Sequence, residues 1–199
     1  MNYIVAKKPG KLLLLTSCFV LMHFFLPVNA DDGKDTVHTL VELFLAWSHQ
    51  YNKKISIAAA NYIDYSTMAE YAVGETWWNK LSATQKNQLS NMLQKLVEQH
   101  YFPRWHKIFY GEHLNILNQT TAGDEVIVHS QLVAGKEEET VIWKLHPKNG
   151  ELKVFDLSVD GRGLLDRLSG RFAKRLSKSG FKGLISWIQH KLEDETLEP

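Results

Sequence analysis

The hydrophobic period of the chain changes twice, and this change limits the folds that the chain can adopt. From about residue 37 to residue 101, apolar residues recur every three or four positions, as they do in amphipathic helices. From about residue 113 to residue 159 they alternate with more polar positions, as they do in half-buried strands. After Gly161 the helical period returns. This order predicts an α+β domain, with several helices gathered on one face of a curved antiparallel sheet.

Capping and turn residues set the expected boundaries. Ser82 and Gln85 form a capping box that should begin the strongest helix, and Pro103 should kink or end that helix. A shorter helix is predicted over residues 63–72, with Gly74 stopping it in a left-handed conformation. Asn149-Gly150 predicts a tight hairpin turn. The other expected elements are a first helix with the apolar stripe Val37, Leu40, Val41, Phe44 and Trp47, strands over 113–120, 126–132, 141–145 and 152–159, and two closing helices over 164–176 and 181–192.

The N-terminal segment has the pattern of a secretory signal peptide. Lys7, Lys8 and Lys11 precede an apolar run over residues 12–26, and Val28-Asn29-Ala30 supplies small residues at the cleavage positions. We therefore expect residues 1–30 to be removed and residues 31–199 to form a single exported domain. An uncleaved N-terminal anchor is the alternative. Cys18 is the only cysteine, so the exported chain would have no disulfide and no thiol nucleophile.

The sequence offers little catalytic chemistry. It contains no G-x-S-x-G, Walker, H-E-x-x-H or G-x-G-x-x-G motif. His100, His106 and His113 have spacings that suit no metal pair on one helix. We expect no catalytic residue, metal or cofactor. The alternative is a small enzyme in which Asp64 or Asp156 acts as a base from an apolar pocket.

Large apolar side chains dominate instead, and they suit the binding of acyl chains. Lipid tails make no directional contacts, and each buried CH₂ contributes about 0.8 kcal/mol. A domain with a filled core would show the same composition. The residues expected to line a lipid pocket are Trp78, Leu93, Val97, Val128, Leu132, Val141, Trp143 and Phe155.

The distribution of charge argues against nucleic acid as a partner and points to a basic surface on the closing helices. The formal net charge is only +1, and this balance argues against nucleic acid as the main partner. The closing helices nevertheless carry basic residues away from their apolar stripes, which predicts either a solvated face or a surface for docking or for approaching a membrane. These residues are Arg167, Arg171, Lys174, Arg175, Lys178 and Lys182.

A set of motifs occurs in a fixed order over about residues 36–192. They are Asp64-(x)4-Ala69-(x)3-Val73-Gly74-(x)2-Trp77-Trp78, Leu81-Ser82-(x)2-Gln85, the segment from Leu89 to Tyr110, Val141-Ile142-Trp143-Lys144-Leu145, Val154-Phe155-Asp156-Leu157-(x)3-Gly161, Arg171-Phe172 and Gly180-Phe181-(x)2-Leu184-Ile185. In this order the motifs resemble those of the MlaC/toluene-tolerance family. Gly161-Arg162-Gly163, which we interpret as a strand-to-helix turn, departs from the Gly-Val-Ser common in the family.

The resemblance implies an NTF2-like fold with a lipid pocket between sheet and helices. It implies a soluble, monomeric periplasmic shuttle that maintains outer-membrane lipid asymmetry. The expected ligand is a phospholipid, and the expected partners are an outer-membrane lipoprotein complex and an inner-membrane ABC transporter complex. A carrier of another apolar ligand, such as a hopanoid, would have a similar sequence.

Export gives a first prediction. If Val28-Asn29-Ala30 is a cleavage site, protein recovered from the periplasm begins at Asp31 and dissolves without detergent. Intact-mass measurement checks this. A mass that retains residues 1–30, or a lipid on Cys18, would contradict the model of a soluble shuttle.

Overall fold

The computed structural model describes residues 32–47 and 52–193, so the expected signal peptide and Cys18 lie outside the described residues. Within these residues, six helices precede the strands: α1 (Asp32–Ala46), α2 (Lys53–Ala59), α3 (Tyr65–Val73), α4 (Glu75–Trp78), α5 (Ala83–His100) and α6 (Phe102–Phe109). Five strands follow: β1 (His113–Ala122), β2 (Glu125–Ala134), β3 (Glu137–Lys148), β4 (Glu151–Val159) and β5 (Arg162–Gly163). The last helix is α7 (Leu164–Glu193).

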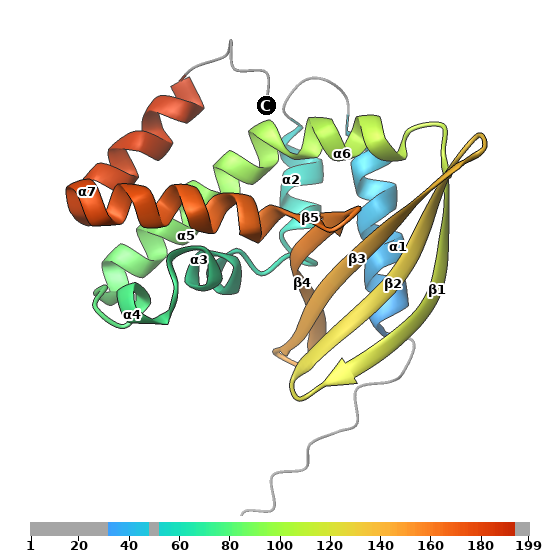
Figure 1. Ribbon diagram of the computed structural model, residues 1–199, viewed down its shortest axis with the longest axis horizontal. Helices are drawn as coiled ribbons and strands as arrows, with labels where there is room; N and C mark the ends of the chain where they lie inside the picture. The colour runs from blue at the N-terminus through green and yellow to red at the C-terminus, as the bar shows by residue number, and fades with distance from the viewer. Residues whose placement is uncertain (1–31, 48–51, 194–199) are drawn as a thin grey trace, which may run out of the picture.

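The strands form one antiparallel sheet in the order β1-β2-β3-β4-β5, and it twists strongly from β1 to β4 (Figure 1). The predicted α+β class and the predicted run of antiparallel strands are therefore confirmed. Asn149 and Gly150 both have positive φ, 56° and 83°, so they form the expected hairpin turn between β3 and β4. The Gly161 turn is followed by the short strand β5 before α7 begins.

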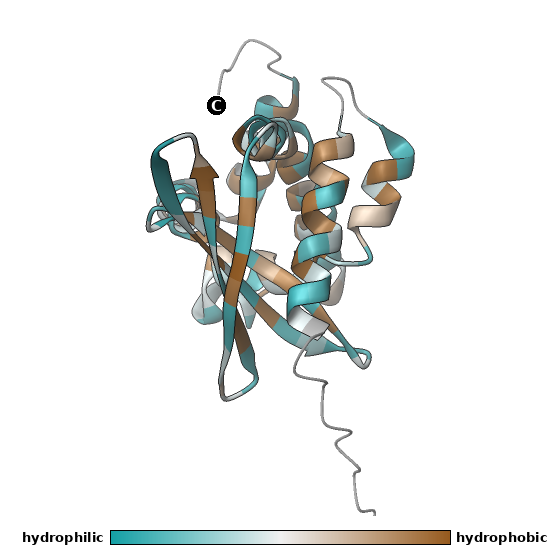
Figure 2. Ribbon diagram, turned by 90° about the vertical axis from the view of Figure 1, so that its right-hand side faces the viewer, coloured by the Kyte–Doolittle hydropathy of each residue, from teal (hydrophilic) through white to brown (hydrophobic). Residues whose placement is uncertain are grey.

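The inner face of the sheet packs against α1 and α6. Trp143 lies at its centre, opposite Val128 on β2 and Leu157 on β4. Its ring stacks at 5.8 Å from Phe109 of α6 and at 6.5 Å from Phe44 of α1, measured between ring centroids. In Figure 2 apolar and polar segments alternate along the strands, which is the pattern of a sheet with one buried face.

Two helix boundaries are set by neighbouring strands and caps. The third helix begins at Tyr65 and not at residue 63, because residues 62–64 hydrogen-bond along β4: Asp64 N–H donates to Val154 O at 2.9 Å. At its end, Gly74 has the expected positive φ of 78°, but its ψ of 154° is extended and not left-handed helical. The capping box of Ser82 and Gln85 is confirmed, and so is the helix break before Pro103.

The last helix has two arms that meet at Gly180. The two closing helices predicted from the sequence are these arms, and Gly180 between them has φ 63° and ψ −167°. Figure 1 shows the orange first arm running from β5 and the red second arm turning away from it. His100 Nε2, at the end of α5, donates to Lys191 O of the second arm at 3.0 Å. The bend therefore brings both arms against α5.

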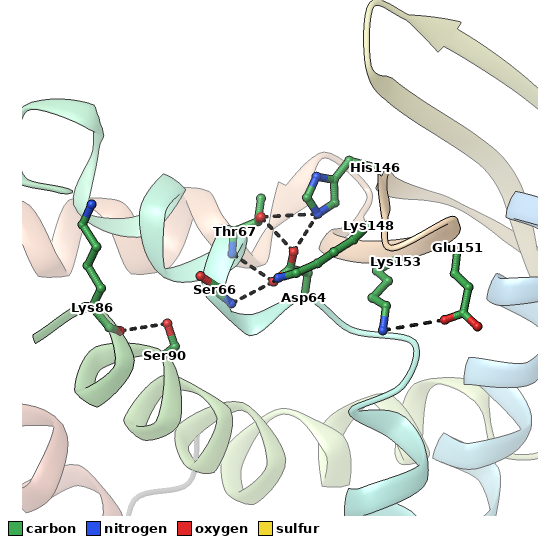
Figure 3. Close-up of polar contacts among 9 residues, drawn as sticks. All are labelled: Asp64, Ser66, Thr67, Lys86, Ser90, His146, Lys148, Glu151 and Lys153. Atoms are coloured by element: carbon green, nitrogen blue, oxygen red, sulfur yellow. Dashed lines mark hydrogen bonds and ion pairs between the residues drawn. The ribbon is translucent and has the colours of Figure 1, made fainter. Parts of the chain in front are cut away.

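Asp64 joins α3 to β3 (Figure 3). Its side chain caps α3 by accepting from Ser66 N–H and Thr67 N–H at 3.0 and 3.2 Å. The same carboxylate accepts from Lys148 Nζ at 2.6 Å and lies 2.7 Å from His146 Nε2. Burial raises the pKa of Asp64, but the hydrogen bonds from Lys148, Thr67 and His146 outweigh burial and lower the pKa to about 2.

The bend at Gly180 predicts opposite effects for two alanine substitutions in one helix. Gly180→Ala should destabilise the protein by about 1–3 kcal/mol, because this backbone conformation is almost exclusive to glycine. Gly170→Ala, in the regular first arm with no atom near its added Cβ, should stabilise by about 0.5–1 kcal/mol. Urea denaturation of both variants checks the signs. Equal effects would show that α7 does not bend at Gly180.

The pKa of Asp64 predicts a stability that depends on pH. Because the pKa is about 2 in the folded state and 3.8 ordinarily, the ionised group stabilises the fold by about 2 kcal/mol at pH values well above 3.8. This contribution should be lost as the pH falls from about 4 through 2. Asp64→Asn should remove it, so that the variant and the parent converge at low pH in urea denaturation.

The control for this prediction is Asp124→Asn, in the exposed turn between β1 and β2. It removes one carboxylate from the surface and should change stability by less than about 0.5 kcal/mol. A difference between Asp64→Asn and the parent that stays constant from pH 7 to pH 3 would contradict the assigned role of the charge.

Candidate functional site

The two carboxylates considered as bases belong to separate networks. Asp64 holds α3 to β3. One ring nitrogen of His146, Nε2, contacts both Asp64 Oδ2 and Thr67 Oγ1. A catalytic relay needs one ring nitrogen for the acid and the other for the hydroxyl. The arrangement is therefore that of a structural clamp, and the lowered pKa makes Asp64 a weak base.

Asp156 is also buried, where β4 meets the start of α7. Its Oδ1 accepts from Leu157 N–H and Leu165 N–H at 3.0 and 3.1 Å, and its Oδ2 is 3.7 Å from Lys144 Nζ. Burial raises the pKa of Asp156, although the two backbone hydrogen bonds and Lys144 oppose the rise. It is thus a buried carboxylate that fixes the start of α7.

The three histidines noted in the sequence do not form a metal site. His100 bonds to α7, the ring of His106 lies 3.0 Å from Phe44 O through Nδ1, and His113 is exposed at the start of β1. No group of three or more potential metal ligands occurs in residues 32–47 and 52–193. Within the same residues, no helix has the length and apolarity needed to cross a membrane.

The eight residues expected to line a pocket are all buried in one hydrophobic core, but in different parts of it. The structure brings four of them together on the inner face of the sheet: Val128, Leu132, Val141 and Trp143. Leu93 and Val97 lie on α5, which packs against α3 and α7, and Trp78 lies in α4. Phe155 sits at a bulge in β4, where its ring packs against Tyr71 at 4.9 Å and His146 at 5.6 Å.

The space between the helices and the inner face is nearly filled. A small apolar cavity there has a volume of about 10 Å³, about the space that one water molecule needs. Of the eight expected residues, Trp143 borders it. The other residues around this cavity are Leu40, Phe44, Ile63, Met68, Trp105, Val154, Asp156, Leu157 and Leu164.

Two larger grooves open on the surface of the protein, outside this cavity. The first, here called the basic groove, has a volume of about 740 Å³ between α5, the start of α6 and both arms of α7. The second, here called the apolar-floored groove, has about 460 Å³ and runs between α6 and the β4–β5–α7 segment. Tyr101, Arg104 and Arg167 line both grooves. The two grooves are therefore adjacent.

The apolar-floored groove and the interior cavity share a wall. Trp105, Leu157 and Leu164 border both of them. Ile108 and Val159 extend the apolar surface along the groove. These three side chains therefore separate the groove from the interior cavity.

The basic groove has a strongly positive lining. Its residues are Leu96, His100, Tyr101, Arg104, Arg167, Leu168, Arg171, Lys174, Arg175, Trp187 and Lys191, and none is acidic. Arg104 lies over the ring of Tyr101 at 5.7 Å, and Arg175 lies over that of Trp187 at 5.6 Å. Burial lowers the pKa of Arg104, and the positive charges of Arg167 and Arg171 lower it further.

Some of the residues that line this groove were predicted from the sequence as a basic surface. Four of the basic residues singled out in the closing helices line it, whereas Lys178 and Lys182, close to the bend, do not. Tyr101, Arg104 and Lys191 were missed. Tyr101 and Arg104 lie beside the first arm of α7 because of how α5 packs, and Lys191 reaches the groove because α7 bends at Gly180. No local sequence pattern reveals either arrangement.

Comparisons with known proteins identify the family. A model of the MlaC protein family matches residues 46–190. Seven solved chains match the structure. One is the phospholipid-binding protein from Ralstonia solanacearum in complex with a phospholipid, with a TM-score of 0.67, 17% identity, and coverage of 82% of this chain and 96% of that chain. No curated protein matches.

Because the identity between the two chains is low, the solved structure shows only that they share a fold. The family model covers well over half of this chain. The resemblance found in the sequence motifs is thereby confirmed. The chain belongs to the MlaC family.

Proposed function

We propose that this protein is a periplasmic carrier of phospholipid. The observation that carries the proposal is the wall of Trp105, Leu157 and Leu164, which separates an open groove from the aromatic core beneath the sheet. Acyl chains that displace this wall would lie against the inner face, where Val128 and Trp143 lie. The phospholipid bound to the Ralstonia solanacearum relative and the MlaC family match support the same ligand.

Burial of the chains supplies the free energy of binding. Each CH₂ that leaves water contributes about 0.8 kcal/mol, and part of this gain is used to open the nearly filled interior. A carrier of this kind needs no catalytic group. The protein would exchange its lipid with an outer-membrane lipoprotein complex and an inner-membrane ABC transporter complex, and so maintain outer-membrane asymmetry.

A small enzyme is the second candidate, and Asp156 is the observation that favours it. This carboxylate borders the interior cavity, and burial raises its pKa, which suits a general base. Asp156→Asn keeps an oxygen that can accept from Leu157 and Leu165. A carrier with this substitution should keep its lipid, whereas an enzyme would lose its turnover.

The carrier predicts bound lipid that depends on the shared wall. Gently purified protein should contain phospholipid by native mass spectrometry. Leu157→Trp should fill the path between groove and interior and reduce the lipid bound per folded protein several-fold. Overpacking should also cost about 1–3 kcal/mol of stability, so melting temperature is measured on the same sample.

The control is Leu89→Trp on α5, at a fully buried position that borders neither groove nor the interior cavity. It should reduce stability and leave the lipid content of the folded protein unchanged. A parent protein that carries no lipid would refute the carrier. A Leu157→Trp variant with full lipid content would place the acyl chains elsewhere.

A further inference from the structure

The basic groove concentrates positive charge without neutralising it. Arg167, Arg171, Lys174 and Arg175 fall at spacings of three, four and seven or eight residues on the first arm of α7, so their side chains share one side of the helix. Arg104 faces them from α6. Within residues 32–47 and 52–193, no carboxylate lies within ion-pair distance of any of these five residues.

Such an arrangement is unfavourable in the protein alone, because like charges on neighbouring turns repel. An anion placed between them would remove the repulsion. Guanidinium groups bind phosphate through two parallel hydrogen bonds, which makes arginine the side chain suited to a phosphodiester. The volume of the groove, about 740 Å³, is also large enough to hold a polar headgroup.

The aromatic rings of the groove decide which headgroups fit. A quaternary or primary ammonium group is commonly held over an aromatic face. Here Arg104 already covers one face of the Tyr101 ring, and Arg175 covers one face of the Trp187 ring. The groove has no acidic lining residue either, so a positively charged headgroup would meet only cations.

The position of the groove matches the path proposed for the acyl chains. Tyr101, Arg104 and Arg167 stand where the basic groove meets the apolar-floored groove. Beyond them lie the apolar residues Leu157 and Leu164 and then the interior. Polar and apolar surfaces thus follow one another in the order that a phospholipid requires.

We propose, on the basis of the function proposed above, that the basic groove binds the headgroup of the carried lipid and selects anionic headgroups, such as phosphatidylglycerol, over zwitterionic ones, such as phosphatidylcholine. The ligand chemistry is a phosphodiester without an ammonium group. Arg171 and Lys174 contribute to this selection through their charge, while the shared wall of Trp105, Leu157 and Leu164 admits the chains.

The test is competition between two lipids with identical acyl chains. Protein purified from the periplasm is equilibrated with vesicles of equimolar phosphatidylglycerol and phosphatidylcholine, separated from them, and analysed for bound lipid. The parent should favour phosphatidylglycerol by about tenfold, the factor that one charge-assisted hydrogen bond provides. The preference should shrink at high salt, which screens exposed charges.

Two double variants on α7 remove the same charge in different places. Arg171→Gln with Lys174→Gln removes two cations from the groove, and the ratio of bound phosphatidylglycerol to bound phosphatidylcholine should fall towards one. Lys178→Gln with Lys182→Gln removes two exposed cations that do not line the groove, and the ratio should remain that of the parent. The melting temperature of each double variant confirms that it is folded.

The possible outcomes separate this proposal from the carrier function. Lipid bound without preference, or an equal loss of preference in both double variants, would overturn headgroup selection and leave the carrier intact. Slower loading of the groove variant with an unchanged final ratio would make the groove a membrane-approach surface and overturn the proposal. Tight binding of inorganic phosphate that survives lipid loading would assign the groove to a soluble anion instead. Absence of both lipids would refute the carrier itself.

Discussion

The packing of Trp143 against α1 and α6 is the interaction on which the rest of the structure depends. Its indole N–H donates to Ser130 Oγ at 2.9 Å, and this hydroxyl donates in turn to Val141 O at 3.0 Å. Because the polar atom of the ring is satisfied within the sheet, the ring can be fully buried without an unpaired donor. Phe44 and Phe109 then stack beside it, and their contacts fix both helices on the inner face.

The position of α6 on this face sets the position of the two grooves. Tyr101 and Arg104 lie at the junction of α5 and α6, and the bent α7 closes the groove opposite them. The Gly180 conformation therefore has a consequence beyond helix geometry, since it brings Trp187 and Lys191 to the groove lined by Arg171 and its neighbours. Charge repulsion in this groove opposes folding, and the apolar contacts of α7 with α3 and α5 offset it.

A closed interior beneath open grooves suits a protein that both holds and releases an apolar ligand. The small cavity next to Trp143 leaves the core well packed. The contacts of Asp64 with His146 and Lys148 hold α3 to the sheet. Exchange of lipid would then need movement of the wall of Trp105, Leu157 and Leu164 and opening of the nearly filled interior beneath it.

The sequence by itself determined the elements whose signals are local. Ser82 with Gln85, Asn149-Gly150 and the alternating residues of β2 and β3 specify their structures through nearby backbone groups and a fixed period. It also placed four cations of the basic groove on one helix. Only the tertiary structure decided which expected pocket residues meet. Val128 and Trp143 share the sheet face, while Leu93 lies in the helical layer, because a period shows that a residue is buried but not against which element. The partners of Arg104 and Asp64 were likewise decided by contacts between segments distant in the chain, for which local propensities carry no information.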